Sequence, residues 1–338
     1  MGNIFAFEKE PDLYPDFAAK LPRQDGKIVV ITGCTTGTGY VAAKLSAEKG
    51  AHVLMLNRPS ERSKKAFEEV KAVASPEAKV TSIDCDLSDF ESVKKAAGEV
   101  KAAVPQLDVL CNNAGVMAFP DQGTKDGYDI QMQTNHLAHF MLTRELFPLL
   151  EKAAAIAGEA RIVNHSSLAR ERMKKLEKEY FGKNSGNLGG DEHGTFMDGP
   201  RWKRYQQTKL ANVVFTNAVH KKLEAQGSKI KSVSCAPGAS STALLNNTES
   251  TGELSSIMKL VIPVYAAFFI QSAEDGTMPL LTCMYDSSVK SGDFYEPADA
   301  GGMKGASRLT TLAEHCLSEQ NEKVLWDCSV EACGEFPL

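Results

Sequence analysis

An excess of positive charge is missing from this chain. Of its 338 residues, 38 are basic and 43 are acidic, which gives a formal net charge of −5 at pH 7. A nucleic-acid-binding protein needs a basic stripe that displaces counterions from phosphates, so we expect no nucleic-acid partner. Charged residues make up 24% of the chain and hydrophobic residues 43%. That usage is typical of a folded globular protein and not of a disordered one.

Paired cysteines, a secretory leader and a long apolar run are also lacking. The eight cysteines are scattered and form no Cys-x-x-Cys pair, which predicts reduced thiols in an intracellular protein. Residues 1–10 carry acidic side chains without an apolar run, so they predict no export signal. The most apolar stretch, 260–270, is too short for a bilayer and contains Pro263. We expect a cytoplasmic protein, with a plastid or another organelle left open because a targeting peptide could have been removed.

Short apolar runs that are rich in β-branched residues alternate with longer segments of helical period. The runs predict strands at 28–32, 52–56, 80–84, 109–111, 162–165 and 230–235, and the segments predict helices at 39–49, 62–73, 88–104, 127–152 and 205–226. This alternation predicts an α/β fold with a doubly wound parallel sheet of the Rossmann type. We expect one domain at 26–325 with a surface insertion at 168–200, an N-terminal arm at 1–25 and a C-terminal tail at 326–338.

A glycine-rich loop follows the first expected strand. The segment Thr32-Gly33-Cys34-Thr35-Thr36-Gly37-Thr38-Gly39 opens a helix, where glycines permit a tight turn and a close approach to a pyrophosphate. The spacing is Gly-x-x-x-Gly-x-Gly, and an ordinary tight turn stays open as an alternative. After the second strand, Arg58 has no acid near it before Glu61, which favours the 2′-phosphate of NADP(H) over the ribose of NAD. We expect Asp86 and Leu87 to hold the adenine.

Further motifs resemble one enzyme family. They are Asn112-Asn113-Ala114-Gly115, Thr134-Asn135-His136-Leu137-Ala138-His139-Phe140, Asn164-His165-Ser166-Ser167, Tyr205-Gln206-Gln207-Thr208-Lys209 and Cys235-Ala236-Pro237-Gly238. In this order they resemble the short-chain dehydrogenase/reductase family over about residues 25–325, in particular its retinol-dehydrogenase-like and WW-domain-containing-oxidoreductase-like branch. The long interval from Ser167 to Tyr205 also resembles the insertion of the light-dependent protochlorophyllide reductases.

Tyr205 and Lys209 are the centre of the expected active site. They are four residues apart, so they share one face of a helix, and a lysine cation beside a phenol lowers the pKa of the phenol. Tyr205 would then exchange a proton with the substrate oxygen. The resemblance implies that Lys209 also binds the nicotinamide ribose, that Asn135 holds a water, and that Ser167 rather than its neighbour Ser166 stabilises the oxyanion.

The expected cofactor-binding residues come from the glycine-rich loop, from the ends of the expected strands and from the family resemblance. It comprises Gly33, Thr35, Thr36, Gly37, Thr38, Gly39, Arg58, Asp86, Leu87, Asn113, Ala114, Gly115, Tyr205, Lys209, Pro237, Gly238 and Thr242. We expect no metal, because His136 and His139 are three apart without a third ligand.

The expected function is NADP(H)-dependent interconversion of a carbonyl and an alcohol on an apolar small molecule. Two alternatives stay open, namely an NADP(H)-binding redox sensor or scaffold with little turnover, and a pigment reductase. The resemblance implies a substrate lid at 245–272, where Phe268 and Phe269 could contact the substrate, the core or a membrane surface. A peripheral membrane contact and a homodimer also stay open.

Overall fold

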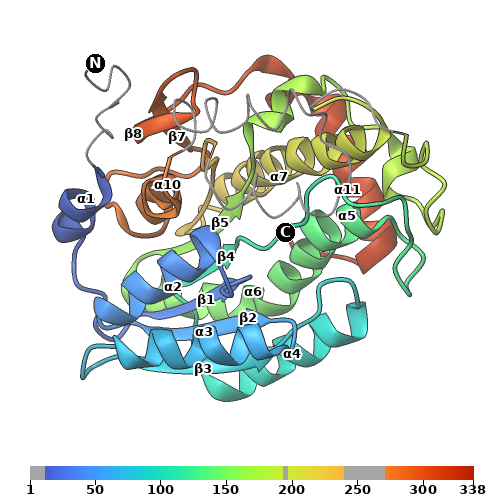
Figure 1. The fold of residues 1–338 in the computed structure, drawn as a ribbon. Helices are drawn as coiled ribbons and strands as arrows, with labels where there is room; N and C mark the ends of the chain where they lie inside the picture. Colours follow the sequence, from blue (N-terminus) through green and yellow to red (C-terminus); the bar gives the residue numbers. More distant parts are fainter. Residues whose placement is uncertain (1–11, 193–196, 240–270) are drawn as a thin grey trace, which may run out of the picture.

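An eight-stranded sheet runs through the centre of the molecule (Figure 1). The structure, a computed structural model, describes residues 12–192, 197–239 and 271–338. The strand order is β3-β2-β1-β4-β5-β6-β7-β8, and only β8 is antiparallel to its neighbour among the described strands. The strands are β1 (Ile28–Thr32), β2 (His52–Asn57), β3 (Lys79–Asp84), β4 (Val109–Asn112), β5 (Ala160–His165), β6 (Ile230–Cys235), β7 (Phe294–Asp299) and β8 (Lys304–Leu309).

Helices cover both faces of the sheet because the inner strands are apolar on both sides. Val29 and Ile31 of β1 face one hydrophobic cluster, which α1, α2, α3 and α10 close, and Val30 faces the other, which α4, α6, α7 and α11 close. The helices are α1 (Tyr14–Lys20), α2 (Gly37–Glu48), α3 (Glu61–Ala72), α4 (Phe90–Ala103), α5 (Ile130–Met132), α6 (Ala138–Ala157), α7 (Pro200–Ala225), α10 (Ala273–Tyr285) and α11 (Glu319–Cys333). Shorter turns are the π-helix η1 (Gln133–Leu137) and the 3₁₀ helices η2 (Leu168–Arg172), η3 (Lys178–Phe181) and η4 (Glu314–Leu317).

The expected doubly wound α/β fold is confirmed, and all six expected strands are present with small shifts at their ends. Strands β7 and β8 have no counterpart in the sequence analysis. Strand β7 contains Pro297, which cannot donate to a sheet ladder, and β8 is a largely exposed edge strand without an apolar run. Periodicity therefore carries little signal at this edge of the sheet.

The insertion after β5 departs from the expected surface excursion. Leu176, Tyr180 and Phe181 are buried in the same hydrophobic cluster as α6 and α7. They are widely spaced apolar residues in a charged segment. The polar composition of the segment therefore predicts surface exposure and gives no sign of the few side chains that are buried.

Both ends of the described chain pack on the body of the molecule. The backbone N–H groups of Leu13 and Tyr14 donate to Asp275 Oδ1 of α10 at 2.9 Å each. At the other end, α11 runs through the expected domain boundary at 325/326. Trp326 and Phe336 pack against Phe140 of α6, with ring centroids 5.6 and 5.5 Å away.

The expectation of unpaired thiols is confirmed, because all eight cysteines are free and buried. In the part of the chain that the structure describes, no helix combines the length and the apolar character that crossing a membrane requires.

Candidate active site

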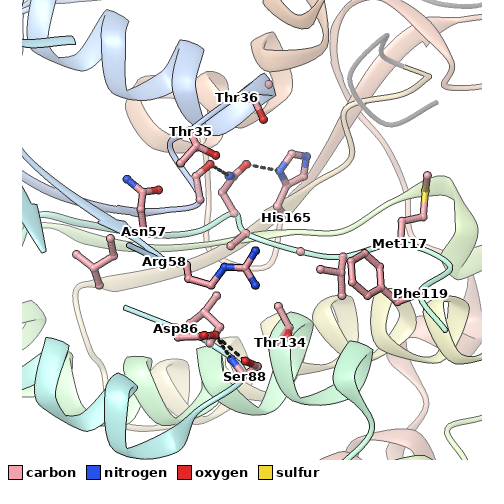
Figure 2. Close-up of a pocket in the computed structure, with 18 of the residues that line it drawn as sticks. Thr35, Thr36, Asn57, Arg58, Asp86, Ser88, Met117, Phe119, Thr134 and His165 are labelled. Carbon is pink, nitrogen blue, oxygen red and sulfur yellow. Dashed lines mark hydrogen bonds between the residues drawn. The ribbon is translucent and has the colours of Figure 1, made fainter. Parts of the chain in front are cut away.

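A cavity of about 1000 Å³ opens at the carboxyl ends of β1, β2, β4 and β5, on both sides of the point where the strand order reverses (Figure 2). Open α/β sheets bind their ligands in this kind of crevice. Most of the expected cofactor-binding residues line it, namely Gly33, Thr35, Thr36, Gly37, Thr38, Arg58, Asp86, Leu87, Asn113, Ala114, Gly115, Tyr205, Lys209 and Pro237.

The glycine-rich loop between β1 and α2 forms one wall of the cavity. Gly33 has a φ of +73°, and a Cβ on it would lie 2.8 Å from the Cβ of Ala114. A Cβ on Gly39 would lie 2.3 Å from Asn113 Nδ2. These glycines therefore let α2 approach the segment after β4 closely. Helix α2 begins at Gly37, so its N-terminal N–H groups and dipole are placed at the cavity, where they can bind an anion.

Basic and neutral donors gather at one end of the cavity. Arg58 and Arg62 both line it and are exposed to solvent. Asn57 Oδ1 accepts a hydrogen bond from the backbone N–H of Cys34 at 2.6 Å, and the buried Asn57 Nδ2 has no partner among the described residues. Arg62 is not among the expected site residues, although a second basic residue in the first turn after β2 is a usable signal. This end suits a phosphate better than a free ribose.

Asp86 is the one acidic side chain among the described residues that line the cavity. Its Oδ1 atom accepts hydrogen bonds from the backbone N–H of Ser88 at 2.9 Å and from Ser88 Oγ at 2.6 Å. The Oδ1 atom thus closes the turn after β3, next to Leu87.

Tyr205 and Lys209 lie on α7 and also line the cavity. Lys209 Nζ donates to the carbonyl oxygen of His165 at 2.9 Å and lies 5.7 Å from the centre of the Tyr205 ring. Burial raises the pKa of Tyr205 to about 12, and a hydrogen bond with Ser167 lowers it in part. Burial also lowers the pKa of Lys209 to about 8. The expected fall in the tyrosine pKa is therefore wrong for the protein alone, because burial has the largest effect on this pKa and raises it.

The two adjacent serines have different partners. Ser167 forms a hydrogen bond with Tyr205 and also accepts one from the backbone N–H of Ala169 at 3.2 Å. Ser166 Oγ instead donates to the backbone carbonyl of Lys209 at 2.7 Å. Only Ser167 thus contacts the hydroxyl of Tyr205, while Ser166 ties β5 to α7.

Asn135 lies in the π-helix η1 between α5 and α6. Its Oδ1 atom accepts from the backbone N–H of Val116 at 2.8 Å, and its Nδ2 atom donates to Val116 O and to Thr208 Oγ1 at 2.9 Å each. Its backbone carbonyl accepts from Asn212 Nδ2 at 2.9 Å. Asn135 therefore fixes the segment after β4 to α7, and the water that the resemblance implies stays a prediction.

Several expected site residues stand apart from the lining. Asn135, Ser167, Gly39 and Gly238 are not among the lining residues. Gly39 packs on Asn113, and Gly238 has a φ of +70° with Met303 O 2.3 Å from where its Cβ would be. Thr242 and the expected lid at 245–272, except for its last two residues, lie outside the described part of the chain. The lid thus stays a prediction.

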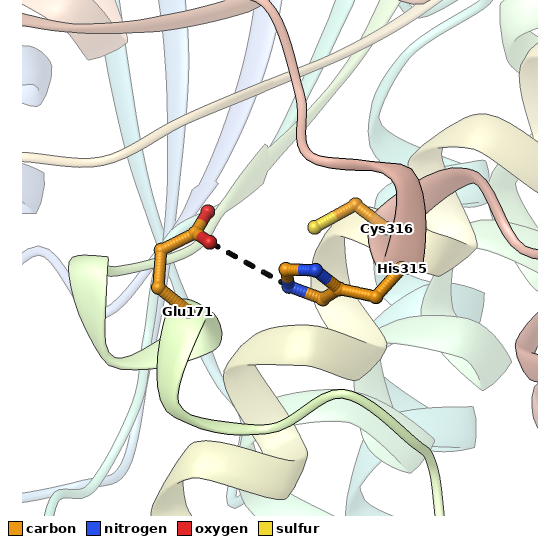
Figure 3. A group of neighbouring side chains, drawn as sticks. All are labelled: Glu171, His315 and Cys316. Atoms are coloured by element: carbon orange, nitrogen blue, oxygen red, sulfur yellow. Dashed lines mark ion pairs between the residues drawn. The ribbon is translucent and has the colours of Figure 1, made fainter.

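A second group of polar side chains lies away from the cavity, where η2 meets η4 (Figure 3). The ligand atoms of Glu171, His315 and Cys316 lie within 4.8 Å of one another. Arg170 already occupies this group, because its Nε atom lies 3.2 Å from Glu171 Oε1 and its side chain hydrogen-bonds Cys316. Since the guanidinium supplies the positive charge, we interpret these residues as an ion-pair cluster and not as a metal site.

Comparison with known proteins agrees with this geometry. The profile of a family described as short chain dehydrogenase matches residues 27–180. An oxidoreductase of Schizosaccharomyces pombe is 37% identical over 228 residues, which cover 66% of this chain and 63% of the yeast protein. Human retinol dehydrogenase 11 is 31% identical over 311 residues, which cover 91% of this chain and 86% of the human protein. A crystal structure of a protein from Mycobacterium paratuberculosis superposes with a TM-score of 0.71 at 28% identity, covering 95% of this chain and 98% of that chain.

Proposed function

This chain belongs to the short-chain dehydrogenase/reductase family, whose members are oxidoreductases that use a nicotinamide cofactor, and we propose that it uses NADP(H) to interconvert a carbonyl and an alcohol. Its relatives place it in the retinol-dehydrogenase-like branch of that family. The substrate in this proposal is an apolar small molecule. Tyr205 is the proton donor, with Ser167 and Lys209 beside it.

The residues of the cavity fit such a cofactor. Arg58, Arg62 and the unpartnered Nδ2 atom of Asn57 supply donors for a 2′-phosphate, and the N-terminus of α2 at Gly37 supplies donors for a pyrophosphate. When it is bound, the cofactor supplies or accepts the hydride.

One observation carries the proposal: Tyr205, hydrogen-bonded to Ser167 and close to Lys209, lines the same cavity as the glycine-rich loop. Ser167 orients the phenol and stabilises the substrate oxygen as it gains charge. Tyr205 delivers its proton to that oxygen. Lys209, held by the carbonyl of His165, contributes positive charge behind the phenol.

The pKa of Tyr205 favours the reductive direction at neutral pH. Burial raises this pKa to about 12, so the phenol carries its proton over the physiological range. Carbonyl reduction consumes that proton, whereas alcohol oxidation first needs the phenolate. We therefore expect the oxidation rate to rise with pH, while proton supply from Tyr205 leaves the reduction rate flat over the physiological range.

The apolar part of the lining supports an apolar substrate. Val116, Met117, Phe119 and Ile130 line the cavity beyond Gly115, and Figure 2 shows Met117 and Phe119 on the same side of it. Burying apolar surface contributes about 25 cal/mol per Å², so this wall favours a hydrophobic carbonyl compound over a polar one.

A carbonyl panel tests the proposal. The panel contains short-chain and long-chain apolar aldehydes and ketones, and NADPH consumption is measured for the wild-type protein and Tyr205→Phe. The tyrosine change should reduce turnover about 10²–10⁴-fold while NADPH affinity stays the same, because it removes the proton donor and keeps the ring.

Tyr285→Phe is a matched control. Tyr285 is another buried tyrosine whose hydroxyl contacts Ser46, and neither residue lines the cavity. This variant should keep its turnover. A wild-type protein that binds NADPH but turns over no member of the panel would contradict the proposed enzyme and favour a cofactor-binding sensor.

A further inference from the structure

A chain of hydrogen bonds connects the glycine-rich loop to the end of β5. Thr38 Oγ1 donates to Asn113 Oδ1 at 2.9 Å, and His165 Nδ1 lies 2.8 Å from the same oxygen (Figure 2). The orientation of the Asn113 amide is fixed, because its Nδ2 atom donates to the carbonyls of Thr32 and Gly33 at 2.9 and 3.3 Å. Asn113 Oδ1 can only accept, so the proton of His165 sits on Nδ1.

The other ring nitrogen of His165 is consequently a hydrogen-bond acceptor. His165 Nε2 is buried, and it has no hydrogen-bond partner in the described part of the chain. The residue is 7% exposed and lines the cavity together with Ser166, Tyr205 and Lys209. Burial, together with the nearby charge of Lys209, lowers the pKa of His165 to about 3, so the ring is neutral at physiological pH. A buried polar atom without a partner is costly, which points to a ligand that supplies the missing donor.

The position of His165 identifies the part of the ligand that it meets. Its backbone carbonyl accepts the hydrogen bond from Lys209 Nζ, so His165 lies beside the expected catalytic residues. A neutral nitrogen lone pair repels a phosphate oxygen, because neither atom has a proton to donate. The fitting donors are an amide N–H or a ribose O–H.

We propose that His165 is a specificity-determining residue that accepts, through Nε2, a hydrogen bond from the nicotinamide-ribose half of the cofactor. This inference rests on the proposed NADP(H) function. His165 would then hold the reactive half of the cofactor, while its bond to Asn113 links that half to Thr38 and the glycine-rich loop. Two donors share the required chemistry, the carboxamide N–H and a ribose hydroxyl.

Two variants separate the nitrogen atoms of the ring. His165→Asn keeps a donor at the position of Nδ1 and removes Nε2, whereas His165→Gln places a polar atom near Nε2 and removes the donor to Asn113. Calorimetric titration of the full chain measures the affinities for NADPH and for 2′,5′-ADP, which lacks the nicotinamide-ribose half. His165→Asn should weaken NADPH about threefold to tenfold, the loss of one hydrogen bond, and leave 2′,5′-ADP unchanged. His165→Gln should retain more NADPH affinity than His165→Asn.

A third ligand identifies the donor. 2′-phospho-ADP-ribose keeps the ribose hydroxyls and lacks the carboxamide. If His165→Asn weakens this ligand as much as NADPH, the donor is a ribose hydroxyl, and if it does not, the donor is the carboxamide. Either result supports the proposal.

Other outcomes overturn it. Equal losses of NADPH and 2′,5′-ADP would show that His165 acts only by shaping the Asn113 segment, and unchanged NADPH affinity in His165→Asn would show that Nε2 meets no ligand. If His165→Asn does not fold, a loss confined to NADPH in His165→Gln supports the proposal, and equal losses of NADPH and 2′,5′-ADP in that variant overturn it. A wild-type protein that binds neither ligand would instead contradict the proposed function.

Discussion

Two walls of the cavity are stabilised by different kinds of contact. At the start of α2, Gly33 lies against Ala114 and Gly39 lies against Asn113, and none of these residues is charged. On the side of the insertion, the fully buried side chain of Arg204 lies 3.6 Å from Asp129 Oδ2 and donates to the carbonyl of Phe119 at 3.2 Å. One wall depends on the absence of side-chain atoms, and the other depends on a buried ion network.

The charged wall fixes segments that are far apart in sequence. Arg204 Nη1 donates to the carbonyls of Leu188 and Gly190 at 3.0 and 2.9 Å, and its Nη2 atom lies 3.4 Å from Asp191 Oδ1. Arg204 directly precedes Tyr205 on α7, so the same turn of helix holds the insertion and presents the proton donor. Charge from Arg204 therefore holds the insertion next to Tyr205, in addition to the apolar packing of its residues Leu176, Tyr180 and Phe181.

The largest expected effect comes from Arg204→Leu. Removing one partner of a buried ion network leaves uncompensated carboxylates and typically costs about 3–5 kcal/mol. We expect a loss of that size in the free energy of unfolding, measured by urea denaturation.

Arg201→Leu is the matched control. Arg201 pairs with the same Asp191 at 3.0 Å, but its side chain is 18% exposed and that of Asp191 is 41% exposed, and exposed pairs are worth about 0–1 kcal/mol. If both variants lost the same stability, the buried network would have no special role in this wall.

Asp129 gives the charged wall a pH dependence. Burial raises its pKa from 3.8 to about 6, against the lowering effect of Arg204. Between these values the folded state binds a proton that the unfolded state has released, so the contribution of Asp129 to stability falls as pH rises from about 4 to 6. Two pKa units correspond to about 2–3 kcal/mol. Asp129 caps the start of α5 by accepting hydrogen bonds from the N–H groups of Gln131 and Met132, and Asp129→Asn keeps a side-chain oxygen that can accept them.

The measurement is the difference in unfolding free energy between the wild-type protein and Asp129→Asn. This difference should move against the wild type as pH increases through that window and then stay constant. A difference that does not vary between pH 4 and 7 would mean that Asp129 keeps an ordinary pKa.

Gly39→Ala tests the uncharged wall. Its Cβ would lie 2.3 Å from both Asn113 Nδ2 and Gly33 O, and overpacking of this kind costs about 1–3 kcal/mol. We expect lower stability and weaker NADPH binding, measured by thermal unfolding and by titration. Gly98→Ala, on an exposed part of α4 with open space around it, should raise stability by about 0.5–1 kcal/mol instead. If Gly39→Ala changed neither stability nor NADPH affinity, α2 could move away from Asn113 without cost.

The two walls also differ in how far the sequence could predict them. The glycine-rich wall was predictable because the glycines that a tight turn and a helix N-terminus need, such as Gly33 and Gly37, are close together in the sequence. The inner strands were predictable because β-branched runs bury both faces of a sheet. Strand β8 was not, because its exposed residues carry neither signal.

Arg204, by contrast, could not be identified from the sequence. Its partner Phe119 is 85 residues away, and it contributes only a backbone carbonyl. Nothing in the residue types of such a contact distinguishes it from a solvated arginine. The predicted direction of the Tyr205 pKa shift was wrong for a related reason. The spacing to Lys209 predicts that the two side chains are close, but only the fold determines burial, and burial decides the direction of the shift.

The smallest expected effect concerns the basic end of the cavity. Arg58 and Arg62 both line it, and the only acid among its described lining residues, Asp86, is held by Ser88. If each arginine makes one charge-assisted contact with a 2′-phosphate, Arg58→Ala and Arg62→Ala should each weaken NADPH about tenfold, which corresponds to about 1.4 kcal/mol. NADH affinity should stay constant, because NADH has no 2′-phosphate. Both arginines are exposed, so the effect should shrink as ionic strength increases. Titration with both cofactors at low and high salt measures these affinities. Equal losses for NADPH and NADH would mean that the arginines support the structure of the cavity wall and do not bind the 2′-phosphate.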